Sequence, residues 1–274
     1  MTEAKTNKIK TLLEAMWQNY LELTPDARTI HDLFASQNNG MVINDHIALR
    51  TYNLDKVNLE TVARPFLDAG YVVGGDYAFP GRKLVAKHFQ HPDDTLPKVF
   101  ISELLVEALS GKAQKIIHSL VDQVTEGSVL LDNFCFSGRP WTVSLQDYDL
   151  LLQESEYAAW VAALGYRPNH FTVSINHLQS HDDIHVLNRM LQDNGFILNE
   201  SGGLVKGSPE VLLEQSSTMA GKVSVSFSDG DRAIPGCFYE FAKRYSLPNG
   251  KLYQGFVAVS ADKIFESTDT RSTQ

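Results

Sequence analysis

Two short stretches of this chain, 45–49 and 169–173, repeat one pattern of residue types, and this repeat constrains the fold more than any other feature. The first reads Asp-His-Ile-Ala-Leu and the second Asn-His-Phe-Thr-Val, so both run polar, histidine, apolar, small, apolar. Each opens a strand-like segment followed by a helix-like segment and three further strand-like segments. The predicted elements are 45–52, 54–69, 71–79, 82–91 and 98–104 in the first copy, and 169–176, 183–194, 196–205, 223–228 and 236–244 in the second. A period this long indicates two pseudo-symmetric half-domains rather than a solenoid.

The rest of the chain is predicted to surround this duplicated core. Residues 1–40 carry apolar side chains at three- and four-residue spacing, which predicts an N-terminal helical extension. Residues 106–167 predict a helical insertion, with helices at 108–124 and 146–164, that wraps or lids the core. The predicted fold class is therefore α+β, with βαβββ halves at 41–105 and 168–260, followed by a polar C-terminal tail at 261–274 that we expect to be frayed near its end.

Composition narrows the choice of partners. Acidic residues outnumber basic ones by 33 to 24, and a chain with a formal charge of −9 binds phosphate backbones poorly because nucleic-acid binding depends on Lys and Arg. No run approaches the roughly 18 apolar residues of a membrane-spanning helix. Cys135 and Cys237 cannot form a disulfide framework, which favours a reducing compartment. We therefore expect a cytoplasmic protein without nucleic-acid or membrane partners, and its oligomeric state is left open.

Side chains on a strand alternate between its two faces, and this alternation groups the polar residues of the repeat. His46 shares one face of its strand with Arg50, and His170 lies at the equivalent place in the second copy. The closing strand of each half leads from an aromatic residue to a glutamate, Glu103 in the first and Glu240 in the second. These polar faces could simply meet solvent. If the halves instead form one curved sheet around a pseudo-twofold axis, the histidines and glutamates converge on that axis.

The converging set predicts a metal site at His46, His170 and Glu240, with Glu103 as a candidate fourth ligand. Two imidazoles and one carboxylate leave open positions and are the ligand pattern of non-haem Fe(II) oxygenases. Adding Glu103 would give a fuller site suited to Lewis-acid proton transfer, so the number of ligands separates two reaction classes. Arg50, four positions after His46, could hold a substrate carboxylate in a bidentate pair, or it could be a surface arginine paired with an acidic neighbour.

Three motifs carry a resemblance to a known family: the His-x-x-x-Arg of DHIALRTY, the histidine of NHFTVSIN and the glutamate of GCFYEFAKR. Over about residues 43–256 they resemble, in this order, the 2-oxoadipate dioxygenase/decarboxylase family, whose core is similar to the vicinal-oxygen-chelate fold. The resemblance implies that His46, His170 and Glu240 bind Fe(II) and that Arg50 holds a carboxylate of a 2-oxo acid. It also implies a reaction with O2 that releases CO2 and converts 2-oxoadipate, or a similar 2-oxo dicarboxylic acid, to a shorter 2-hydroxy acid.

Two other functions stay open at this point. A glyoxalase-like isomerase or hydrolase would use Ni(II) or Zn(II) with Glu103 as the fourth ligand. A metal-free binding module could also have kept the duplicated fold, because a fold alone does not determine function. Bound iron, together with O2 uptake on a 2-oxo acid, would favour the dioxygenase over both.

Overall fold

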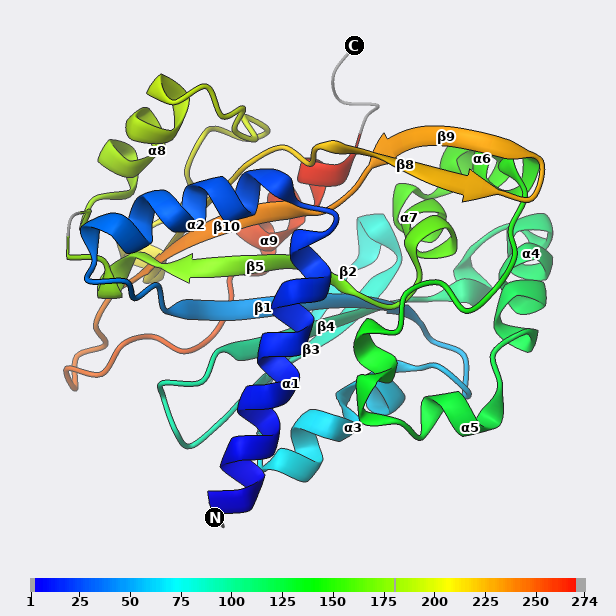
Figure 1. Cartoon of the computed structure of the whole chain (residues 1–274), viewed down its shortest axis with the longest axis horizontal. Coiled ribbons are helices and arrows are strands. Elements are labelled where there is room, and N and C mark those ends of the chain that lie inside the picture. Colours follow the sequence, from blue (N-terminus) through cyan, green and yellow to red (C-terminus); the bar gives the residue numbers. More distant parts are fainter. Residues whose placement is uncertain (1–2, 180, 270–274) are drawn as a thin grey trace.

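One eight-stranded sheet forms the centre of the protein, in the strand order β2-β3-β4-β1-β5-β10-β7-β6 (Figure 1). The computed structural model describes residues 3–179 and 181–269. One half of the sheet belongs to the first repeat, with β1 (Asn44–Tyr52), α3 (Leu59–Ala69), β2 (Val72–Phe79), β3 (Leu84–Gln90) and β4 (Lys98–Leu104). The other half belongs to the second repeat, with β5 (Pro168–Ser174), α8 (Ile184–Asp193), β6 (Lys206–Ser208), β7 (Leu213–Ser217) and β10 (Phe238–Arg244). The predicted fold class, α+β with a duplicated βαβββ core, is confirmed.

The two halves meet at an antiparallel seam between β1 and β5. Across this seam Ile47 pairs with Phe171, which is its own counterpart in the repeat, so the pseudo-twofold axis passes between these two residues. In each half the opening strand also pairs in parallel with the closing strand, β1 with β4 and β5 with β10. Equivalent residues of β1 and β5 therefore lie close together at the middle of the sheet.

The helix in each half begins and ends at residues that suit these positions. The side-chain oxygen of Asn58 accepts a hydrogen bond of 3.0 Å from the backbone N–H of Thr61 at the start of α3. That helix ends at Gly70, whose φ of 105° lies in the left-handed region that favours glycine. Asp183 caps α8 in the same way, with its carboxylate accepting from the backbone N–H groups of His185 and Val186. Local sequence thus fixes the ends of both crossover helices.

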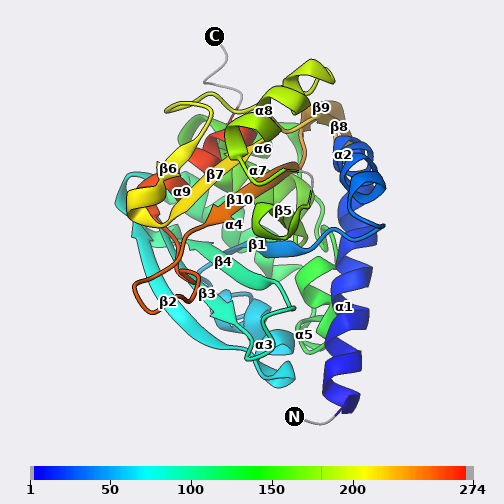
Figure 2. The same ribbon diagram turned by 90° about the vertical axis from the view of Figure 1, so that its left-hand side faces the viewer.

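Different helices cover the two faces of the sheet (Figure 2). The N-terminal helices α1 (Glu3–Leu21) and α2 (Pro25–Gln37) lie on one face, where the rings of Trp17 and Tyr20 each pack 5.0 Å from the ring of Phe171. On the opposite face lie α9 (Ala258–Ile264) and the 3-10 helix η6 (Phe265–Thr268). This opposite face is the one that carries the predicted ligands.

The insertion between the halves is helical, with α4 (Gly111–Asp122), α5 (Glu126–Val129), α6 (Leu145–Glu154) and α7 (Glu156–Leu164). Every residue of α7 is buried, because this helix packs against one end of the ligand-bearing face. There the hydroxyl of Tyr157 donates a 2.7 Å hydrogen bond to the carbonyl of Ser102 on β4. The insertion therefore closes one end of that face, and the boundaries drawn between extension, halves and insertion stay a prediction.

Two of the strands expected in the second half are placed differently in the structure. Residues 196–205 form no strand, and the edge strand is the short β6 that follows them. Residues 223–228 fall mostly in β8 (Lys222–Phe227), which pairs with β9 (Gly230–Pro235) in a separate hairpin and does not join the main sheet. On the side of β10 away from β5, the neighbouring strand is β7, whose sequence Leu-Glu-Gln-Ser-Ser lacks the apolar alternation of a typical strand.

The end of the chain is also more ordered than its sequence indicates. Residues 261–268 continue α9 and form η6, and Ser267 and Thr268 are buried although a frayed polar tail was expected there. These hydroxyls have partners inside the protein, since Ser267 contacts Ser217 at 2.9 Å. Residues 270–274 of the predicted tail and residues 1–2 of the predicted extension lie outside the described residues.

None of the helices in residues 3–179 and 181–269 is long and apolar enough to span a lipid bilayer.

Candidate metal centre

The two predicted histidines lie side by side at the middle of the sheet. Across the seam His46 is opposite Thr172 and His170 is opposite Ala48, so both imidazoles leave the sheet on the same face and lie diagonal to each other. Their ring centroids are 5.5 Å apart, with an angle of 83° between the ring planes. Both side chains are buried, which excludes the reading in which this polar face meets solvent.

Glu240 reaches the same point from β10, where it lies opposite Thr172 of β5. Its Oε1 is 3.5 Å from Nε2 of His46, and its Oε2 is 3.1 Å from Nε2 of His170. One ligand atom from each of the three side chains lies within 4.8 Å of the other two. The carboxylate is fully buried, with 0% of the residue exposed. The structure therefore brings together the three residues predicted as the core of a metal site.

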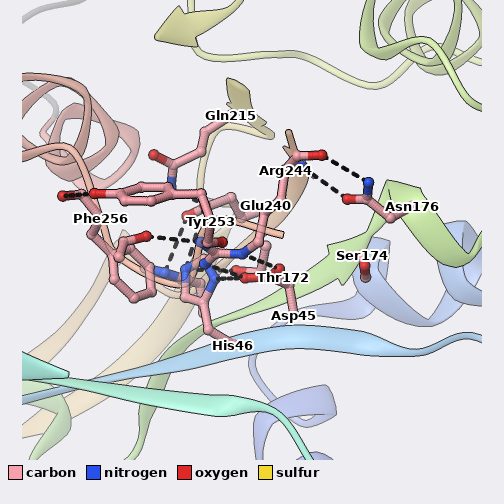
Figure 3. Close-up of polar contacts among 12 residues, drawn as sticks. Asp45, His46, Thr172, Ser174, Asn176, Gln215, Glu240, Arg244, Tyr253 and Phe256 are labelled. Atoms are coloured by element: carbon pink, nitrogen blue, oxygen red, sulfur yellow. Dashed lines mark hydrogen bonds and ion pairs between the residues drawn. The ribbon is translucent and has the colours of Figure 1, made fainter. Parts of the chain in front are cut away.

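Hydrogen bonds behind the rings fix which nitrogen faces the centre. Asp45 accepts from Nδ1 of His46 at 2.8 Å (Figure 3). The side-chain oxygen of Asn169 lies 3.2 Å from Nδ1 of His170. Because each Nδ1 then carries the proton, each Nε2 presents its lone pair to the centre. The hydroxyl of Thr172 donates to Nε2 of His46 at 3.1 Å. Both histidines thus have the tautomer that a metal ligand needs.

The donor set fits a divalent cation. Burial holds the pKa of His170 well below its usual value, so this ring stays neutral and its lone pair stays available. Burial raises the pKa of Glu240 because desolvation disfavours its anion, and a bound cation would compensate that cost. Within the described residues, Oε2 of Glu240 is buried and accepts no hydrogen bond. The two Nε2 atoms and the carboxylate of Glu240 are all acceptors and face one another, and a cation bound between them would satisfy all three.

The counterpart of Glu240 in the first half is Phe100, not a carboxylate. Ala48 and Thr172 occupy the same position in the two opening strands, and the residues opposite them in the closing strands are Phe100 and Glu240. Glu103 lies three residues beyond Phe100 and therefore points to the other face of the sheet. The prediction of Glu103 as a fourth ligand was wrong, because it matched the two closing strands by residue type and not by register.

Glu103 instead holds the start of a helix. Its Oε2 accepts a hydrogen bond of 2.8 Å from the backbone N–H of Leu59, the first residue of α3. A negative charge at a helix N-terminus is stabilising because the first N–H groups have no partners within the helix. Burial nevertheless raises the pKa of Glu103, and the bond to Leu59 opposes that rise.

Arg50 lies on the same face as His46, in the wall of the same cavity. Its guanidinium is packed between aromatic rings, 5.0 Å from the ring centroid of Tyr157 and 4.9 Å from that of Trp160. One terminal nitrogen donates to the hydroxyl of Thr268 at 3.0 Å, and the other lies 3.4 Å from a carboxylate oxygen of Glu156. Among the described residues its Nε has no hydrogen-bond partner. Arg50 is therefore a buried cation with a free donor, not a surface arginine.

A small cavity joins the candidate metal site to Arg50. Its volume is about 30 Å³, room for roughly one or two water molecules. The polar lining comes from the three candidate ligands, Arg50, Ser102, Asn169 and Gln215, and the apolar lining includes Phe100, Phe238, Phe256, Ile264 and Phe265. A dicarboxylate is larger than this space. The segments that cover it are the chain around Phe256 together with α9 and η6.

Sequence reasoning missed several residues of this site. Gln215 donates from its amide nitrogen to Oε1 of Glu240 at 2.6 Å, but it lies on the strand that was not predicted. Phe256 packs its ring 4.7 Å from the ring of His46, and no pattern in the sequence distinguishes it from a core residue. A usable signal did exist for Asp45 and Asn169, because each directly precedes a candidate ligand in the repeated motif.

Comparison with known proteins decides the family of this chain. The family model for 2-oxoadipate dioxygenase/decarboxylase matches residues 1–133 and 129–252. The chain belongs to the 2-oxoadipate dioxygenase/decarboxylase family. A relative named 2-oxoadipate dioxygenase/decarboxylase, chloroplastic/amyloplastic, from Oryza sativa subsp. japonica is 37% identical over 284 residues, an alignment that covers 94% of this chain and 78% of the relative.

Solved structures of similar proteins match nearly the whole chain. The crystal structure of hydroxyglutarate synthase from Oryza sativa, in complex with 2-oxoadipate, is 36% identical and superposes with a TM-score of 0.93 over 100% of this chain and 96% of that one. A protein from Shewanella frigidimarina NCIMB 400, described as a hydrolase, is 59% identical with a TM-score of 0.87 over 91% of this chain and 98% of that one. Both of these proteins are close to this chain in length and share its fold.

Proposed function

We propose that this chain is an Fe(II)-dependent dioxygenase/decarboxylase that converts a 2-oxo dicarboxylic acid, 2-oxoadipate or a similar compound, to a 2-hydroxy acid one carbon shorter. The observation that carries the proposal is the convergence of His46, His170, Glu240 and Arg50 on one buried cavity. The family supports the reaction class, and the rice relative crystallised with 2-oxoadipate supports the substrate class.

In this proposal Fe(II) is held by His46, His170 and Glu240. The first half of the sheet provides no further ligand, so the remaining coordination positions of the metal stay open. Phe100 stands where a fourth donor would be expected by symmetry, so the protein supplies three ligands. Three protein ligands on one face are the pattern that accommodates a chelating substrate and O2. The bound iron would supply the electrons that activate O2 beside the substrate.

The other residues of the cavity position the substrate and exclude water. Arg50 pairs with a carboxylate of the 2-oxo acid, using the Nε donor that has no partner among the described residues. The rings of Tyr157 and Trp160 keep the guanidinium away from water, which strengthens its interaction with an anion. Phe238, Phe256 and Phe265 line the rest of the cavity and limit side reactions with solvent.

The proposed reaction balances without a further reductant. The bond between C1 and C2 of the 2-oxo acid breaks, and C1 leaves as CO2. One atom of O2 enters the new carboxylate at C2, and the other is inserted into a C–H bond at C3, so that this hydrogen stays on the hydroxyl group of the product. With 2-oxoadipate as substrate, the six-carbon acid and O2 give CO2 and the five-carbon acid 2-hydroxyglutarate, and every hydrogen of the substrate is kept in the product.

Metal analysis and O2 uptake test this proposal together. The purified chain, loaded anaerobically with Fe(II), should consume O2 on addition of 2-oxoadipate and release CO2 and 2-hydroxyglutarate in a ratio of 1:1:1. A panel of 2-oxo acids with and without a second carboxylate then defines the substrate class. Absence of O2 uptake with every member of the panel, in a chain that holds three-ligand Fe(II), would overturn the assignment.

A metal-dependent hydrolase is the second candidate, because the Shewanella relative is described as a hydrolase. Three protein ligands with one open position also suit catalytic Zn(II), where a bound water becomes the nucleophile. Activity with Zn(II) and no O2 uptake with Fe(II) would favour this candidate. The glyoxalase-like isomerase with Glu103 as fourth ligand loses its basis, since Glu103 lies on the other face of the sheet.

For the location of the protein we propose the cytoplasm. Cys135 and Cys237 are both buried and free, which suits a reducing compartment. The rice relative is named as chloroplastic/amyloplastic, so a fluorescent fusion is the direct test of this point.

A further inference from the structure

Arg244, at the end of β10, lies directly behind one of the candidate ligands. Its Nε and one terminal nitrogen donate to the two carboxylate oxygens of Asp45, at 2.7 and 2.9 Å. The same carboxylate accepts from Nδ1 of His46. Arg244 and Asp45 are both buried, so this bidentate pair is protected from solvent. The orientation of His46 is thereby fixed through Asp45 by a guanidinium (Figure 3).

The remaining terminal nitrogen of Arg244 binds a different part of the chain. It donates to the carbonyl of Tyr253 at 3.0 Å and to the carbonyl of Gly255 at 2.7 Å. Its guanidinium carbon also lies 5.1 Å from the ring centroid of Phe256. We call residues 253–256 the cover segment, because Phe256 packs on His46 and lines the cavity. Arg244 thus binds both Asp45, which supports the candidate ligand His46, and the cover segment.

The second half of the site has no such connection. Asn169, the counterpart of Asp45, is neutral, and its side-chain nitrogen has no hydrogen-bond partner among the described residues. By register the counterpart of Arg244 is Leu104, an apolar residue at the end of β4. Among the described residues, the link between ligand support and cover is therefore found at His46 and not at His170. An asymmetry within a duplicated site indicates a specific role for the residues that create it.

We propose that Arg244 is a positioning residue that couples cation binding at His46 to closure of the cover segment. This inference rests on the metal site of the proposed function. A cation on Nε2 fixes the His46 ring, and the ring in turn orients Asp45 and the guanidinium paired with it. The guanidinium then presents its free edge to the carbonyls of Tyr253 and Gly255. Because such coupling is reciprocal, a closed cover segment also strengthens cation binding.

Hydrogen exchange with a metal ion alone tests the coupling without any turnover. In the cover segment, the N–H of Tyr253 donates to the carbonyl of Tyr245 at 2.9 Å and the N–H of Phe256 donates to the hydroxyl of Tyr77 at 3.1 Å, so both amides report closure. Addition of Co(II) to the wild-type chain should slow their exchange by about 5-fold or more, the range typical of coupled sites.

Variants of the two linked residues separate coupling from simple support. In Arg244→Gln the Co(II)-dependent protection should be lost, and the affinity for Co(II) should fall by about 10- to 100-fold, as for other supports of metal ligands. Asp45→Asn keeps the shape of the side chain but removes its charge, and it should lose the same protection. Arg232→Gln is the control, since Arg232 of β9 also pairs with an aspartate, Asp149 of α6, but this half-exposed pair lies outside the candidate site.

Each outcome bears on the inference. Protection by Co(II) that is unchanged in Arg244→Gln overturns it, even if the wild-type chain consumes O2 as proposed. A lower melting temperature in Arg244→Gln, with unchanged metal affinity and unchanged Co(II)-dependent protection, shows a merely structural role and also overturns it. If the wild-type chain shows the coupling but no O2 uptake, the inference stands and the proposed reaction falls. If the wild-type chain binds no metal, both fall.

Discussion

Replacement of Arg50 by glutamine is the sharpest test of how the cavity recognises its substrate. A hydrogen bond to a charged group contributes about 1.5–3 kcal/mol, and a bidentate pair would make two of them. Arg50 already donates to Thr268, and its other terminal nitrogen lies beside Glu156, so the full sum does not apply. A loss of about 2–4 kcal/mol is expected, which corresponds to a fall of about 30- to 1000-fold in kcat/KM.

The assay also identifies which carboxylate Arg50 binds. O2 uptake is measured with 2-oxoadipate and with 2-oxohexanoate, which has the same chain length but ends in a methyl group. If Arg50 binds the far carboxylate, Arg50→Gln lowers kcat/KM for 2-oxoadipate and leaves that for 2-oxohexanoate nearly unchanged. If it binds the carboxylate next to the keto group, both substrates lose equally. A fall of less than threefold with both would refute the role given to this residue.

A second variant separates substrate binding from stability. Removal of the Arg50 cation leaves Glu156 in a buried position beside a neutral residue, which lowers stability. In the double variant Arg50→Gln, Glu156→Gln this charge is removed as well, so the melting temperature should recover. The kcat/KM for 2-oxoadipate should stay as low as in the single variant, because the guanidinium is still absent.

Four further substitutions test other parts of the structure. His170→Ala and Glu240→Gln each remove one donor, so the affinity for Co(II) should fall by more than about 100-fold; retained binding would place the cation elsewhere. Glu103→Gln should keep metal affinity within about twofold of wild type and lower the free energy of unfolding in urea by about 0.5–1 kcal/mol, because the start of α3 loses a negative charge. Burial lowers the pKa of His88 from 6.5 to about 4. The unfolded chain therefore takes up this proton at higher pH than the folded chain, and the free energy of unfolding of the metal-free protein should fall by at most about 3 kcal/mol as the pH drops from about 6.5 to 4. His88→Gln should flatten this part of the stability curve, and an unchanged curve would contradict the assignment.

The duplicated architecture and most of the candidate site could be predicted because they depend on local patterns. Alternation along the strands at 45–52 and 169–176 placed His46 and His170 on polar faces, and the repeat itself indicated that these faces meet. The prediction of Glu103 as a ligand failed because strand register is set by pairing with the opening strand, and residue types alone do not reveal that pairing. Matching Phe100 to Phe238 by type shifted the alignment by two residues from the observed register.

The parts that could not be predicted are those where polar residues fill the interior. β7 carries buried polar side chains such as Gln215 and Ser216, which bind Glu240 and Asn188, so its sequence looks like a loop. Ser267 and Thr268 look like a frayed tail for the same reason, yet Thr268 is a partner of Arg50. Patterns of apolar residues detect elements that face a hydrophobic core and miss elements that face a polar site.

The exchange of a carboxylate for an aromatic ring between the two copies has a wider consequence. With Glu240 in the second half and Phe100 at the equivalent position of the first, the two halves contribute unequally: the second supplies two of the three candidate ligands, and the first supplies His46 and Arg50. A reactant must then reach a metal held here from the side of the first half, because the second half already supplies two of the three ligands. The side from which a reactant can reach the ion therefore depends on which of the two equivalent strands carries the carboxylate.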